Sequence, residues 1–153
     1  MSPEMLGQLM EEHAAALVLY ARQWCRAPED VVQEAFLKLM AQKPPPQHPV
    51  PWLYRVVRNG SISAARKASR RRRHESTAAA RSPPWFATAE TAALDAQTAA
   101  SALQELPLEQ REIIVAHLWG GLTFAQIAEL TGTSASTAHR VYVAGLFALR
   151  ERL

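Results

Sequence analysis

The sequence predicts an all-α protein made of two small helical domains joined by a linker. Of its 153 residues, 48% are hydrophobic and 28 are Ala, while only 7% are aromatic, a composition that suits helix interiors better than strands. Prolines fall where helices begin or must stop. Residues 74–89 lack periodicity and contain small and polar residues with two prolines, which is typical of a linker. The expected domains are therefore residues 1–73 and 90–153.

Three helices are expected in the first domain. The first covers residues 3–25, because Ser2 and Pro3 can supply the N-cap and the first helical residue, and apolar residues then recur at helical spacing. The second begins at Pro28, carries acids in its first turn and must stop before Pro44. The third runs from Pro51 to residue 73. Its expected inward face consists of Leu53, Val56, Val57, Gly60 and Ala64.

The second domain is expected to contain a helix-turn-helix within residues 123–140. Helices over residues 90–106 and 107–119 come first, and two glycines end the latter. Thr123 then opens a short helix with a Thr-x-x-Gln capping box, Gly132 supplies the left-handed turn, and Ser134 caps the last helix. This last helix can place side chains in a DNA major groove, although an ordinary helical hairpin would share the pattern. The residues expected on its exposed face are Ser134, Ser136, Thr137, His139 and Arg140.

The positive charge is concentrated in one short segment. Residues 52–73 carry eight bases and no acid, whereas residues 1–51 have a net charge of −2 and residues 74–153 a net charge of −3. Trp52 and Tyr54 are interleaved with these bases, and aromatic rings beside cations suit single-stranded DNA. The alternatives are that the aromatic residues belong to the core and that the arginine run is a solvated tail.

Several function classes find no support in the sequence. It has no nucleophile-base arrangement, no metal-ligand spacing and no glycine-rich phosphate loop, so we expect neither an enzyme nor a metal or cofactor site. The single Cys25 cannot form an internal disulfide. The longest apolar stretch is far shorter than a membrane span, so we expect a cytoplasmic chain without membrane insertion.

Three segments of the chain resemble a bacterial RNA polymerase sigma factor of the extracytoplasmic-function (ECF) group in the sigma-70 family. They are PEDVVQEAFLKLMAQ, PWLYRVVRNGSISAARKASRRRR and LPLEQREIIVAHLWGGLTFAQIAELTGTSASTAHRVYVAGLFALRERL, in that order. The resemblance implies a region 2 domain that binds the β′ clamp helices of core RNA polymerase and melts the minus-ten promoter element. It also implies a region 4 domain that reads the minus-thirty-five element and touches the β flap. An anti-sigma factor is a further implied partner.

The resemblance assigns roles to particular residues. The core-binding helix would present Asp30, Gln33, Glu34, Phe36 and Leu37. The minus-ten segment would use Trp52, Arg55, Arg58, Asn59, Ser61, Ile62, Ser63, Arg66 and Lys67. The minus-thirty-five element would meet Thr123, Ser134, Ser136, Thr137, His139 and Arg140.

The chain departs from the family pattern at two places. Gly60-Ser61-Ile62-Ser63 stands where members commonly have Leu-Ala-Ile-Asp, and His139 and Val141 replace the more usual Lys and Arg. Fewer permanent charges predict weaker minus-thirty-five binding. Two other functions stay open, namely a polymerase-independent DNA-binding regulator and a sigma-like decoy for an anti-sigma factor.

Overall fold

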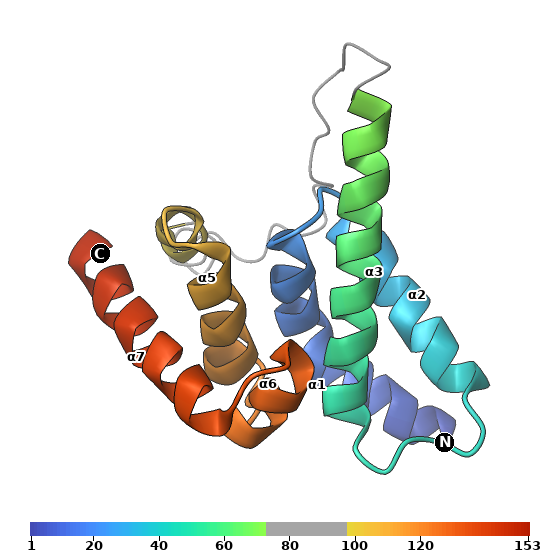
Figure 1. Cartoon of the computed structure of the whole chain (residues 1–153). Coiled ribbons are helices and arrows are strands. Elements are labelled where there is room, and N and C mark those ends of the chain that lie inside the picture. The colour runs from blue at the N-terminus through green and yellow to red at the C-terminus, as the bar shows by residue number, and fades with distance from the viewer. Residues whose placement is uncertain (73–97) are drawn as a thin grey trace.

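The computed structural model describes residues 1–72 and 98–153, and every regular element in these two stretches is helical (Figure 1). The all-α prediction is confirmed for these residues. The predicted linker, residues 74–89, lies outside them, so the domain limits remain a prediction. The N-terminal helices are α1 (Pro3–Arg22), α2 (Pro28–Ala41) and α3 (Pro49–Arg72). The C-terminal helices are an unlabelled helix over residues 98–104, α5 (Leu108–Ile114), η2 (Val115–Trp119), α6 (Phe124–Thr131) and α7 (Ala135–Arg152).

The N-terminal helices begin where proline and capping chemistry place them. The Ser2 side chain accepts a hydrogen bond from the Met5 amide at 3.2 Å, and α2 begins at Pro28 as predicted. The other two helices differ from the prediction at one end each. α1 ends at Arg22 and not at residue 25, because the amides of Gln23 and Trp24 bond to carbonyls only three residues back. α3 begins at Pro49, since a proline is tolerated throughout the first turn of a helix, where its missing N–H is not needed.

The inward face of α3 is broader than predicted. Leu53 and Val57 are fully buried, as expected, but Val56, Gly60 and Ala64 are only partly buried. Tyr54 and Ser61 are fully buried instead. Tyr54 packs against the Tyr20 ring of α1 and against Gly120 just after η2, a contact that was not foreseen, and Ser61 lies beside the Cys25 thiol.

The signals of the helix-turn-helix are confirmed in detail. Thr123 and Gln126 form a reciprocal capping box with bonds of 2.9 and 3.1 Å, and Gly132 adopts a left-handed conformation with φ of 72°. The Ser134 side chain accepts a hydrogen bond from the Thr137 amide at 3.1 Å. The helix before this motif also reaches Trp119 as predicted, but its last part, η2, is a π-helix.

One continuous hydrophobic core runs through both described stretches. α1 packs against α2, α3 and η2, and α3 also contacts α6, so α1 and α3 face the C-terminal helices (Figure 1). The fully buried rings of Tyr20 and Tyr54 lie 4.9 Å apart near this junction, and Ile114 and Val115 are buried in the same core. The two halves of the chain therefore pack together, a question that the sequence left open.

Replacing glycine by alanine should change stability in opposite directions at Gly132 and Gly7. Gly132→Ala forces a side chain into the left-handed region, so the free energy of unfolding should fall by about 1 kcal/mol. Gly7 lies in α1 with open space around it, so Gly7→Ala should raise this free energy by about 0.5–1 kcal/mol. Urea unfolding followed by circular dichroism measures both. A shift of the same sign in the two variants would contradict the assigned turn.

Candidate polymerase and promoter surfaces

The outer face of α2 carries four of the five residues predicted to bind core polymerase. Asp30, Gln33, Glu34 and Leu37 are exposed and follow one helical face, with Leu37 56% exposed. Phe36 lies on the opposite side and is only 4% exposed, so it is a core residue and not part of this surface. The helix thus combines acids, an amide and an uncovered apolar side chain on one face.

Sequence reasoning missed one residue of this face. Met40 is 59% exposed and lies one turn after Leu37 on the same helix. The Leu-x-x-Met spacing at the end of α2 was the available signal. Two uncovered apolar side chains one turn apart make a small hydrophobic contact area beside the acids.

The predicted minus-ten residues separate into two groups along α3. Trp52 and Arg55, at its start, line a cavity of about 270 Å³ together with Gln126, Glu129 and Leu130 from α6. Arg58 lines a second cavity of about 270 Å³ against α5 and the helix-turn-helix. These three residues therefore face the C-terminal helices.

The second group faces α2. Asn59, Ser63 and Lys67 line a groove of about 530 Å³ whose opposite wall includes Asp30 and Glu34. The groove thus brings predicted minus-ten residues beside two residues of the polymerase-binding prediction. Of the other predicted minus-ten residues, Ile62 is half-buried and Arg66 is exposed. Ser61 is fully buried, so its predicted contact with DNA does not fit this structure.

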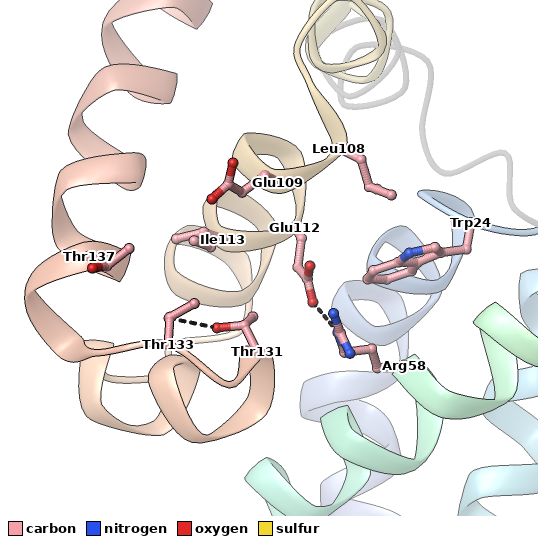
Figure 2. A pocket seen from close by; sticks show the side chains of 9 residues that line it. All are labelled: Trp24, Arg58, Leu108, Glu109, Glu112, Ile113, Thr131, Thr133 and Thr137. Carbon is pink, nitrogen blue, oxygen red and sulfur yellow. Dashed lines mark hydrogen bonds and ion pairs between the residues drawn. The ribbon is translucent and has the colours of Figure 1, made fainter.

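A buried polar cluster joins the two stretches of the chain, and we call Tyr20, Arg58 and Glu112 the Glu112 cluster. Glu112 Oε1 accepts a hydrogen bond from the Tyr20 hydroxyl at 2.7 Å. It accepts another from Arg58 Nε, which Figure 2 shows. The Glu112 side chain is only 7% exposed and that of Arg58 is 26% exposed. The Trp24 ring lies 5.8 Å from the Arg58 guanidinium. The three members of the cluster come from α1, α3 and α5.

The electrostatics of the Glu112 cluster follow from burial and charge. Burial and the nearby Glu112 carboxylate raise the pKa of Tyr20 well above its usual value, so this hydroxyl remains a donor. Burial works against the charge of Arg58, but the hydrogen bond and charge of Glu112 outweigh it and raise the pKa of Arg58. Sequence reasoning did not identify Tyr20 or Glu112. The available signal for Glu112 was its position, since this acidic residue lies one turn before the apolar residues Val115 and Ala116.

Arg111 makes a second polar link between the stretches. Its guanidinium donates to the Leu106 carbonyl at 2.9 Å and to the Gln23 carbonyl, just after α1, at 3.4 Å. Burial lowers the pKa of Arg111. A cation suits this position because unpaired carbonyls and the negative end of the dipole lie at a helix C-terminus.

The predicted minus-thirty-five residues lie together on the helix-turn-helix. Thr123, Ser134, Ser136, His139 and Arg140 are exposed, and Thr137 is half-buried. The Arg140 guanidinium donates to Thr137 Oγ1 at 3.3 Å. The His139 ring packs edge-on against Phe124, with centroids 5.1 Å apart. The motif therefore presents hydroxyls, one imidazole and one permanent cation on its outer surface.

Residues 1–72 and 98–153 contain no group of three or more His, Cys, Asp or Glu side chains able to hold a metal ion. No helix within the same residues is long and apolar enough to cross a membrane.

Comparison with known proteins places both stretches in one family. Residues 9–71 match Sigma-70 region 2, and residues 97–141 match Sigma-70 region 4. The chain is 33% identical over 147 residues to the ECF RNA polymerase sigma factor SigL of Mycobacterium tuberculosis, in an alignment that covers 87% of this chain and 80% of SigL.

Solved structures share the fold. The sigma factor RpoE in complex with the anti-sigma factor NepR from Bartonella quintana gives a TM-score of 0.74 at 23% identity, covering 99% of this chain and 97% of that one. CnrH in complex with the cytosolic domain of CnrY gives 0.64 at 22% identity, covering 98% and 88%. With the family matches and the identity to SigL, the resemblance of the sequence is confirmed, and the chain belongs to the ECF group of the sigma-70 family.

Proposed function

We propose that this chain binds core RNA polymerase through α2, engages the minus-ten element through α3, and reads the minus-thirty-five element through α7. Promoter-directed transcription initiation is the function of its family, and the chain carries both family regions. The observation that carries the assignment is the groove between α2 and α3. It joins the predicted polymerase-binding acids to predicted minus-ten residues on a single surface.

The α2 face suits a helical protein partner with basic and apolar side chains. Asp30 and Glu34 supply negative charge, and Leu37 and Met40 supply uncovered apolar area. Exposed apolar side chains rimmed by polar ones mark protein contacts more often than bare solvent faces. The β′ clamp helices of core polymerase are the partner that we assign to this face.

The DNA surfaces differ in charge. α3 ends with Arg70, Arg71 and Arg72, all exposed, and carries Lys67 one turn earlier, so its C-terminal half can neutralise phosphates beside melted bases. The helix-turn-helix offers Arg140 as the permanent cation among its predicted contacts, with serine and threonine hydroxyls around it. We infer that minus-thirty-five binding is the weaker of the two. Contact of the C-terminal helices with the β flap belongs to the same proposal.

The proposal includes three further assignments. The protein is a transcription initiation factor without catalytic chemistry of its own, and it acts in the cytoplasm. Since the similar structure of RpoE holds a sigma factor with the anti-sigma factor NepR, an anti-sigma factor is the expected regulatory partner. A polymerase-independent regulator would bind DNA without α2, and a decoy would not open promoters.

Run-off transcription with purified core polymerase on genomic promoter fragments, together with core binding in gel filtration, tests the proposal. Leu37→Asp should weaken core binding about tenfold or more, because a contact that buries this side chain contributes about 1.5–3 kcal/mol. The matched control is Met5→Asp, at a residue 54% exposed on α1, which should bind core normally. No core binding, or no specific transcript from the wild-type chain, would overturn the sigma assignment.

Arg140→Ala should reduce transcription from promoters that contain a minus-thirty-five element. Loss of one good guanidinium contact to a base costs about 1–3 kcal/mol, so we expect about a tenfold loss of affinity for this element. Arg150→Ala, an exposed site further along α7, removes the same charge and serves as the control. DNase footprinting of the holoenzyme gives the readout. Unchanged upstream protection in Arg140→Ala would refute the role of this residue.

A further inference from the structure

The outer surface of the helix-turn-helix carries little permanent charge for a surface that meets DNA. Arg140 is the permanent cation among its predicted minus-thirty-five residues, and the others are serine and threonine side chains and His139. Contacts between cations and phosphates supply much of the affinity of proteins for DNA, so each further positive charge on this surface matters. An imidazole can supply one, because its charge changes between about pH 5 and 8. His139 is the member of the predicted set with this property.

Aromatic packing holds His139 in place on this surface. Its ring meets the Phe124 ring at 88°, with centroids 5.1 Å apart. Phe124 is the first residue of α6, which packs along the start of α7 (Figure 1). His139 is nevertheless exposed. The imidazole therefore has a defined position while it stays open to solvent and to DNA, and a side chain that is already held loses less conformational freedom on binding.

A second imidazole supports the Phe124 ring. His117 of η2 stacks on Phe124 with centroids 4.3 Å apart and an angle of 19° between the rings. The His117 Nδ1 donates to the Leu122 carbonyl at 2.8 Å, and the Tyr142 ring meets the same imidazole at 4.7 Å. These contacts occupy His117 within the protein, so it positions Phe124 and, through that ring, His139.

No carboxylate neutralises a proton on His139. None of the ion pairs within residues 1–72 and 98–153 involves this side chain. The charged neighbour on α7 is Arg140, which follows it in the sequence. The titratable residue of α6 is Glu129, which lines the cavity against the start of α3, and that of η2 is His117. A positive charge gained by His139 is thus free to meet a phosphate, whereas Arg140 disfavours that charge until DNA arrives.

We propose that His139 is a proton-dependent DNA contact, so that binding of the minus-thirty-five element by this chain strengthens as the pH falls. The inference rests on the proposed function for the placement of α7 on this element. A phosphate beside His139 stabilises the protonated imidazole, so the complex holds more protons than the free partners and the affinity rises at lower pH. Once the imidazole is charged in the free protein as well, the gain levels off. The device makes the use of such promoters respond to acidification.

Anisotropy with a labelled DNA duplex tests this contact in the holoenzyme. The duplex is the upstream part of a genomic promoter fragment that the holoenzyme transcribes, with the minus-thirty-five element but without the minus-ten element. We measure its affinity at pH 6 and pH 8 at constant ionic strength. The wild type should gain about three- to fivefold more affinity on acidification than His139→Gln, which cannot take up the proton. His139→Lys keeps its charge and should bind at both pH values about as tightly as the wild type does at pH 6.

Two further variants identify the titrating group. His13→Gln removes an imidazole from α1 and should keep the response of the wild type to pH. His117→Gln removes the imidazole that lies behind Phe124 and should also keep most of it. An equal response in the wild type and His139→Gln would overturn the inference, as would a response that disappears only in His117→Gln. Since His139 is exposed, its variants should fold, and circular dichroism checks this.

The outcomes separate this inference from the proposed function. If the wild-type holoenzyme binds the duplex equally at both pH values, only the role of the His139 proton fails, and the assignment of α7 to the minus-thirty-five element stands. If it binds the duplex at neither pH, or gives no specific transcript, the proposed function fails and the inference falls with it.

Discussion

A single buried carboxylate links three helices from both stretches of the chain. Glu112 accepts hydrogen bonds from Tyr20 and Arg58, and these donors belong to α1 and α3. A carboxylate that is only 7% exposed needs such partners, because desolvation without them would be prohibitive. The Tyr20 ring, whose hydroxyl donates to this carboxylate, also packs against the Tyr54 ring, and Tyr54 lies against Gly120. These polar bonds join the two stretches alongside a hydrophobic core that is continuous across both.

As a consequence, the two halves of α3 have different surroundings and different proposed roles. Its first half packs against the C-terminal helices and supplies Arg58 to the Glu112 cluster. Its second half lines the groove with α2 and ends in exposed arginines. We infer that the second half is available to DNA, beside the α2 face that we assign to core polymerase.

Local signals made much of the fold predictable. Proline at helix starts, the Thr123 capping box and Gly132 act within a few residues, so the sequence contains everything that these features require. The residues of the exposed α2 face were assigned through the resemblance to sigma factors, which also included the buried Phe36. The burial of Ser61 and the pairing of Arg58 with Glu112 were not predictable, since these depend on which helices meet α3 from outside its own segment. Periodicity in the sequence identifies the buried face of a helix but not the element that packs against it. A basic residue gives the same sequence pattern whether its side chain meets solvent, a DNA phosphate or a carboxylate from a distant part of the chain.

The most direct measurement is the distance between spin labels on the exposed residues Ser69 of α3 and Glu151 of α7, compared between the wild-type chain and Glu112→Gln. Native Cys25 is buried and would be replaced by serine, so that only the introduced cysteines react. We expect one narrow distance distribution in the wild type and a broader one in Glu112→Gln. The same distribution in both would contradict a link between the two stretches made by Glu112.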